Sequence, residues 1–196
     1  MKSQLFLTIV VLAVAAVVAR ADDVVGRPIE SWQPGMLKIH QISTGRGNAG
    51  LYIFPDGTTL LVDAGELPGP SPKHTPARPD DTRRAGEWVV RYVRHALRHD
   101  PQPALDYVLL THFHQDHMGE VAAGMPVSPH GYTLTGVTRV VEDLKVGKLL
   151  DRGWPDYGNA TQPEAPFMKN YLACVKWQAE KNGLQVERFA PGRNDQ

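Results

Sequence analysis

The chain has 196 residues, 42% hydrophobic and 21% charged, which is typical of one globular domain and excludes disordered and collagen-like chains. Lys plus Arg number 21, as do Asp plus Glu, so a net charge of zero gives no indication of specific nucleic-acid binding. The single cysteine, Cys174, cannot form a disulfide within the chain. We expect it to be a small buried apolar side chain.

The amino terminus has the pattern of a secretory signal peptide. Residues 5–19 are apolar except for Thr8, and the small-residue motif at 19–21 follows them. The alternative is a membrane anchor, but a bilayer span needs roughly 20 apolar residues and this run is shorter. We therefore predict a signal peptide over residues 1–21 and cleavage before Asp22. The mature protein would be secreted (periplasmic or extracellular), with no membrane span.

Residues 22–35 contain prolines and glycines and predict an irregular lead-in to a domain over residues 36–196. That domain opens with three strand-like runs, of which the second and third are joined by a Pro-Asp-Gly turn into a hairpin. The runs are residues 36–42, 51–54 and 58–62. Five prolines within residues 65–79 then predict a long surface loop.

The rest of the chain alternates predicted helices and strands. Asp80, Asp81 and Thr82 are expected to open a helix that ends before Asp100–Pro101. The apolar run within residues 105–111 predicts a strand buried on both faces. Three further elements are a short strand, a helix and a strand at residues 148–150, 164–182 and 184–189. This order predicts an α/β fold in which helices cover a sheet.

The strongest functional signal follows the predicted strand at 105–111. Residues 112–117, here called the histidine loop, contain His112, His114, Asp116 and His117. Side chains two residues apart in an extended chain point to the same side, so His112 and His114 can share one metal ion. Asp116 and His117 can hold a second. Imidazole and carboxylate ligands suit zinc, and manganese or iron could use the same set.

The alternative is a solvated histidine-rich tract. It is disfavoured because the loop directly follows an apolar strand, which is where α/β proteins place their sites. A second candidate pair, His95 and His99, lies among arginines off the apolar stripe of its helix, so a solvated surface is expected there. His130 lies in a Pro- and Gly-flanked loop that could border the site.

The histidine loop resembles the H-x-H-x-D-H signature of the metallo-β-lactamase-fold hydrolase superfamily. The run Leu60-Leu61-Val62-Asp63-Ala64-Gly65 resembles that family's earlier hallmark, and the resemblance implies that Asp63 braces the metal loop. Residues 45–50 before the Pro-Asp-Gly turn look like the branch that contains the hydrolase domain of DNA-uptake competence proteins. That branch usually carries Asp where Asn48 stands.

The resemblance implies the amino-terminal portion of an αββα sandwich and a metal-dependent hydrolase. Two zinc ions in the complete domain would activate water to cleave an ester, phosphodiester or related bond of a small-molecule or phosphodiester substrate. Asp116 would also act in catalysis by orienting the hydroxide. Gly45, Gly47 and Gly50 also match a dinucleotide-binding fingerprint. That motif must open a helix, and a predicted strand follows here, so we reject it.

The family completes its site with a later His, Asp and His, and no histidine follows His130 in this sequence. Among the later acidic residues Asp151 is the best candidate ligand, but a structural role is expected for it. We therefore expect an incomplete domain at the carboxyl end, with one sheet face lacking its partner, which could favour self-association. The alternative function is a non-catalytic half-domain that retains a residual metal-binding loop.

Overall fold

The computed structural model describes residues 27–196 except residues 70, 159 and 161. The predicted signal peptide and its cleavage site before Asp22 lie outside the described residues. Residues 31–196 form one compact unit. Trp32 belongs to this unit, because its indole Nε1 donates hydrogen bonds to the carbonyls of Met36 (2.7 Å) and Phe54 (3.1 Å).

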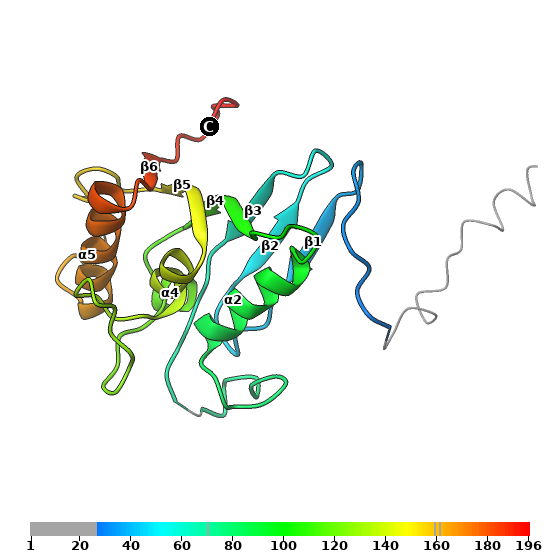
Figure 1. Ribbon diagram of the computed structural model, residues 1–196. Helices are drawn as coiled ribbons and strands as arrows, with labels where there is room; N and C mark the ends of the chain where they lie inside the picture. Colours follow the sequence, from blue (N-terminus) through cyan, green and yellow to red (C-terminus); the bar gives the residue numbers. More distant parts are fainter. Residues whose placement is uncertain (1–26, 70, 159, 161) are drawn as a thin grey trace, which may run out of the picture. The chain divides into compact units, whose positions relative to one another are not determined.

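A six-stranded sheet, whose strands lie side by side in chain order, forms the centre of the unit (Figure 1). The first two pairings are antiparallel, and the pairings from β3 to β6 are parallel. The strands are β1 (Lys38–Gln41), β2 (Gly50–Ile53), β3 (Thr59–Val62), β4 (Ala104–Leu109), β5 (Lys145–Asp151) and β6 (Gln185–Arg188). This mixed sheet with its helices confirms the predicted α/β class.

The predicted hairpin is present between β2 and β3. Ile53 pairs with Thr59, and the Phe54 amide donates to the Thr58 carbonyl at 2.8 Å. Gly57 has φ of +93°, a conformation that residues with a Cβ adopt at a cost. The Pro-Asp-Gly sequence therefore predicts the turn correctly, because its glycine adopts the positive φ of the turn.

Three helices cover one face of the sheet. They share a single hydrophobic core with Leu61 of β3, Val108 of β4 and Leu149 of β5. In Figure 1, α4 lies between α2 and α5. The helices are α2 (Ala85–Ala96), α4 (Gly136–Asp143) and α5 (Pro166–Lys181), and a short α3 (Gln115–Met118) lies in the loop after β4. No helix in the described part of the chain is long and apolar enough to cross a membrane.

The predicted start of the first helix is wrong by several residues. The Asp80 carboxylate accepts hydrogen bonds from the amide and hydroxyl of Thr82, which makes a local turn before the helix. The helix begins at Ala85 instead, because other carboxylates satisfy its first amides. Glu87 accepts from the Arg84 amide at 3.0 Å, and Glu66 accepts from the Gly86 amide at 2.8 Å.

The strand before the histidine loop is buried on only one face, which corrects the expectation of burial on both. Val108 is buried against the helices, whereas Tyr107 and Leu109, which point to the other face, are partly exposed. Helix α4, which has only eight residues, was not predicted, although Val137, Val140 and Val141 stand at the i, i+3, i+4 spacing of a helix face. The helix ending at Lys181 and the final strand β6 agree with the sequence-based expectation.

The second face of the sheet carries partly exposed apolar side chains. Cross-strand pairing places them in adjacent rows, since residues directly opposite each other point to the same face. One row runs from Ile39 through Tyr52 and Leu60 to Tyr107, and the next includes Val62 and Leu109. Ile39 is 62% exposed. We call these six residues the open sheet face, because no described helix packs on them.

Candidate metal centre

The histidine loop begins where β4 ends. The strand's pairing with β5 continues for one residue, since the Leu110 amide donates to the Leu150 carbonyl at 2.8 Å. The chain then turns into the loop and the single-turn α3, in which the amides of His117 and Met118 both bond to the His114 carbonyl. Phe113 is buried, whereas His112, Asp116 and His117 are half-buried and His114 is exposed. The alternation within the loop therefore directs one side chain to the core and the polar ones outward.

The three imidazoles of the loop lie together. His112 Nε2 and His114 Nδ1 are 3.1 Å apart, and the centroid of the His112 ring is 4.0 Å from that of His117. His117 Nε2 is 3.9 Å from the Asp116 carboxylate. All four predicted ligands are thus neighbours.

The spacing of His112 and His114 fits one metal ion. Two nitrogens that bind the same tetrahedral zinc at 2.0–2.1 Å are about 3.3 Å apart, close to the 3.1 Å between these two. As the side chains stand, however, no group of three or more His, Cys, Asp or Glu among the described residues is arranged to hold a metal ion. The imidazole and carboxylate groups are therefore suitable zinc ligands, and the distance between the His112 and His114 nitrogens fits one ion. The four side chains stand as two pairs, however, and do not surround a single ion.

Burial and positive neighbours lower the pKa of His112. Desolvation is the largest cause, and repulsion from His117 and His114 adds to it, whereas Asp63 and Asp116 act in the opposite direction. A lowered pKa keeps an imidazole neutral at neutral pH, which is the form that binds metals. The grouping of the three rings thus favours the ligand form of His112.

Asp63 supports the histidine loop through hydrogen bonds, which is the role that the resemblance implies. Its carboxylate is fully buried and accepts hydrogen bonds from the Thr111 amide (2.8 Å) and hydroxyl, and it lies 2.7 Å from His117 Nδ1. A carboxylate on Nδ1 leaves Nε2 as the ligand atom and holds the ring in one orientation. Asp63 has φ of +59°, an uncommon conformation that Asp and Asn tolerate better than most residues.

Asn48 completes the hydrogen bonds of Asp63. Its amide Nδ2 donates to Asp63 Oδ2 at 3.0 Å, and its Oδ1 accepts from Gln41. A carboxylate at position 48 would face the Asp63 carboxylate and repel it unless it were protonated or bound a cation. Asn48 therefore suits a position in contact with a buried anion, where the branch that the sequence resembles usually carries Asp.

Two glycines allow the chain to pass close beneath Asp116. The Asp116 carbonyl accepts from the Asn48 amide at 2.8 Å, and a Cβ added to Gly65 would lie 1.8 Å from that oxygen. A Cβ on Gly47 would lie 2.6 Å from the same atom. The glycine-rich run at residues 45–50 thus serves close backbone packing against the histidine loop. It leads into strand β2, which agrees with our rejection of a dinucleotide fingerprint.

A second buried carboxylate, Glu66, was not predicted. It is 2% exposed and accepts hydrogen bonds from the amides of Gly86 (2.8 Å) and Gly136 (3.1 Å), and it forms an ion pair with Arg84. It therefore ties the first turns of α2 and α4 to the strand end that carries Asp63. The only sequence signal was an acidic residue immediately after the Asp-Ala-Gly run, where we expected a surface loop.

Asp151 has the structural role that the sequence predicted. Its two oxygens accept from the amides of Gly153 and Trp154 and from the hydroxyls of Tyr157 and Tyr171, all at 2.7–2.8 Å. These bonds occupy both oxygens of the fully buried carboxylate. The rings of Tyr157 and Tyr171 contact Phe113, so this cluster supports the histidine loop through its one buried side chain.

The other histidines lie outside the loop cluster. His95 is exposed on α2, and His99 follows the helix end and contacts Trp32. His130 stacks on Trp177 of α5 with ring centroids 3.5 Å apart. His40 of β1 is buried, and its Nδ1 is 3.1 Å from the Tyr92 hydroxyl. Cys174 is free and buried as predicted, and burial raises the pKa of its thiol.

A scan of the chain against protein-family models gave no match, and a search of curated proteins gave none either.

Proposed function

We propose that the chain is a metal-dependent hydrolase that resembles the metallo-β-lactamase superfamily and holds zinc on the histidine loop. The observation that carries the proposal is the gathering of His112, His114 and His117 above a buried carboxylate that fixes the ring of His117. In metal sites, a histidine that binds the metal through one ring nitrogen usually donates a hydrogen bond from its other ring nitrogen, often to a buried carboxylate. The finer assignment to an αββα sandwich belongs to the same proposal.

In the proposed reaction His112 and His114 would hold one zinc ion, and Asp116 and His117 would contribute to a second. Bound zinc would supply an acidified water and polarise the bond to be cleaved. Asp116 has a half-exposed carboxylate near His117 Nε2, so it can accept a proton from water or orient it toward substrate. Asp63 keeps His117 in one tautomer, and the substrate would be a carboxylic or phosphoric ester.

Zinc analysis with matched variants tests this proposal. The purified full chain, dialysed against zinc, is expected to retain metal that the double variant H112A/H114A loses. The variant H95A/H99A removes two histidines from a region outside the loop and should retain metal like the wild type. Metal retained by H112A/H114A, or lost only from H95A/H99A, would contradict the assignment to the histidine loop.

Hydrolysis of bis(p-nitrophenyl) phosphate, a generic phosphodiester, tests the activity. We expect slow zinc-dependent turnover, because each ion has two clear protein ligands where a catalytic zinc usually has three. Asp116→Ala should remove most of that rate while the protein stays folded.

The ligand deficit also favours a second candidate function. In the described residues no group of three ligands stands ready for metal, which suits a non-catalytic protein with a residual metal-binding loop. That candidate predicts weak retention of zinc and no turnover above free zinc. Zinc-dependent turnover that Asp116→Ala removes would exclude it.

A further inference from the structure

An unusually basic groove lies beside α2, outside the histidine loop. Its volume is about 750 Å³, and it is bounded by the end of β1, the Arg78–Pro79 segment and one side of α2. Arg78, Arg91, Arg94 and His95 line it, and among the described lining residues there is no Asp or Glu.

The arginines of the groove differ in their partners from Arg84 and Arg139, which form ion pairs. Arg84 is paired with Glu66, and Arg139 with Asp143 at 2.7 Å. Within the described chain Arg78, Arg91 and Arg94 form no ion pair with a carboxylate. Arg94 donates only to the backbone carbonyl of Asp143, at 2.7 Å. Among the described residues, no carboxylate therefore pairs with the positive charge of the groove.

Trp88, which also lines the groove, holds part of this charge in place. The guanidinium groups of Arg83 and Arg91 lie 5.3 Å and 5.7 Å from its ring centroid. Such cation–π contacts restrict a long side chain, so less conformational entropy is lost when Arg91 binds an anion. Because two guanidinium groups already lie over this ring, the groove offers charge and hydrogen-bond donors rather than a surface for stacking a base.

We propose that this groove binds a small phosphate-bearing ligand with more than one phosphate group. Guanidinium groups form paired hydrogen bonds with phosphate oxygens, and all three fixed cations here are arginines. A tetrahedral phosphate presents oxygens in several directions, whereas a carboxylate presents two in one plane. The volume is in the range of sites for small ligands and exceeds the size of a single phosphate ion. No residue of the histidine loop lines the groove, so this proposal stands apart from the proposed hydrolase activity.

Calorimetric titration of the full chain with pyrophosphate, in metal-free buffer, tests the proposal without involving zinc. Wild-type protein should bind, and the triple variant R78Q/R91Q/R94Q should bind at least tenfold more weakly. The matched control K169Q/K176Q/K181Q removes the same charge from exposed positions on α5 and should bind like the wild type. If the control loses as much affinity as the groove variant, or if pyrophosphate does not bind, the proposal is wrong.

Three further measurements keep the result specific. The indole N–H resonance of Trp88 should shift on titration, which locates binding even if the triple variant fails to fold. Citrate carries comparable charge on carboxylates, and equal affinity for citrate would overturn the assignment to phosphate. Titration with a short single-stranded oligonucleotide distinguishes a small phosphate-bearing ligand from a nucleic-acid backbone, which also carries phosphate groups. Binding of that strand without binding of pyrophosphate would contradict a small-ligand site.

Discussion

Asp63 shows how one buried side chain can set the chemistry of a neighbouring loop. Four groups surround its carboxylate, contributed by Asn48, by the amide and hydroxyl of Thr111, and by His117. Hydrogen bonds from several donors stabilise the ionised form of a buried carboxylate and compensate for its lost hydration. Its negative charge in turn fixes the orientation of the His117 ring, so one residue links the fold to the proposed metal site.

Asp63→Asn tests this link cleanly, because Asn keeps the shape and tolerates the positive φ of the site. The NH₂ group of the new Asn would face the hydrogen-bond donors that now surround the Asp63 carboxylate. We therefore expect a loss of about 2–3 kcal/mol in the free energy of unfolding. Zinc affinity should fall roughly 10- to 100-fold, as for other partners of ligand histidines. Urea denaturation and zinc titration measure the two effects.

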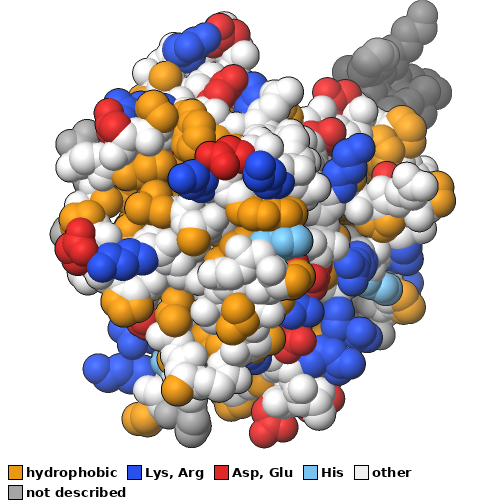
Figure 2. Space-filling view, turned by 60° about the vertical axis from the view of Figure 1, so that its left-hand side comes forward, with side chains coloured by type: hydrophobic (Ala, Val, Ile, Leu, Met, Phe, Trp, Pro, Cys, Tyr) orange, Lys and Arg blue, Asp and Glu red, His pale blue; other side chains and the backbone are white. Residues whose placement is uncertain are grey.

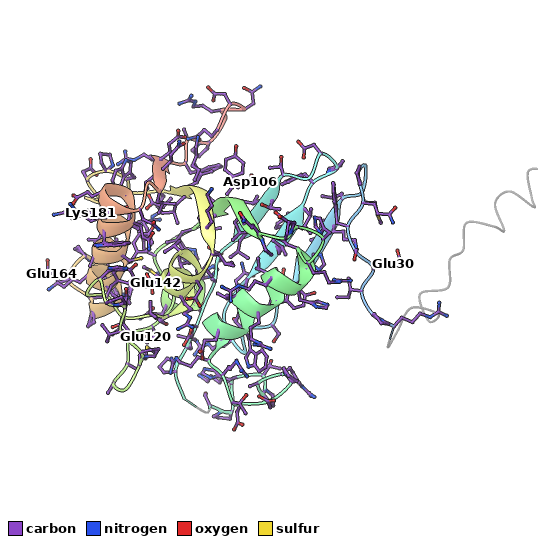
Figure 3. All side chains as sticks on the ribbon, in the orientation of Figure 1. Glu30, Asp106, Glu120, Glu142, Glu164 and Lys181 are labelled. Carbon is purple, nitrogen blue, oxygen red and sulfur yellow. The ribbon has the colours of Figure 1, made fainter. Side chains whose placement is uncertain are left out.

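Asp106→Asn is the matched control for that variant. Asp106, labelled in Figure 3, is an exposed carboxylate that accepts from the amide and hydroxyl of Thr59 at 2.8 Å. This substitution should cost less stability and leave zinc affinity unchanged. Equal effects of the two substitutions on zinc would contradict the bracing role of Asp63.

His40 predicts how stability depends on pH. Burial, with a smaller contribution from Lys38, lowers the pKa of its imidazole below the unfolded value of 6.5. The unfolded chain therefore binds a proton more readily, so His40 destabilises the fold as pH falls below about 6.5. His40→Gln removes this titration, and the difference in unfolding free energy between pH 8 and pH 5.5 should become smaller. An unchanged difference would show that His40 is not protonated less readily in the folded protein.

Among the elements, the junction of β3, β4 and the glycine run determines where the loop lies. Parallel strands β3 and β4 end side by side, so the residues that follow them, Asp63 and Thr111, meet at one edge of the sheet. The Ala64 amide donates to the His117 carbonyl at 2.9 Å, and the Gly65 amide donates to the Asn48 carbonyl at 2.8 Å. Three segments that are distant in sequence are therefore joined by backbone hydrogen bonds, which is why their glycines matter.

Gly65→Ala tests this junction. A Cβ at position 65 would lie 1.8 Å from the Asp116 carbonyl, so the histidine loop must move. We expect a loss of about 2–4 kcal/mol in the free energy of unfolding, in the range of overpacked sites, and weaker zinc binding. Gly158→Ala is the control, since its Cβ would meet only the Asp156 carboxylate, at 3.9 Å. Thermal unfolding of the two variants should differ clearly, and similar melting temperatures would contradict the tight contact.

The sequence predicts elements well where local patterns carry the information. The Pro-Asp-Gly turn predicted the hairpin. Gly183 predicted the end of α5, which ends at Lys181 and is followed by Asn182 and Gly183. The start of α2 could not be predicted, because Glu66, eighteen residues before Arg84, supplies the partner for its first turn. Likewise, the histidine cluster was visible as a motif, but the contacts of Asn48 and Glu66 arise only when the chain folds.

At the scale of the whole molecule, the two faces of the sheet are unequal. Helices cover one face with a continuous core, whereas Ile39, Tyr52, Leu60, Val62, Tyr107 and Leu109 form the open sheet face. Figure 2 shows hydrophobic side chains (orange) among charged ones on the surface that it presents. Strand β1, which carries Ile39, is an edge strand of the described sheet, and such edges favour pairing between chains.

This asymmetry predicts that the protein associates with a second copy through the open sheet face. Burying partly exposed apolar side chains removes their area from water, at about 25 cal/mol per Å², and edge strands can extend a sheet across two chains. Sedimentation velocity over a wide range of protein concentration should therefore show a shift from monomer toward dimer. Ile39→Lys places a charge on this face and should move the transition to higher concentration.

Val127→Lys is the matched control, because Val127 is 64% exposed, similar to Ile39, but lies in the loop before α4. If wild-type protein stays monomeric at every concentration, or if both lysine variants shift the transition equally, the open sheet face is not the site of association.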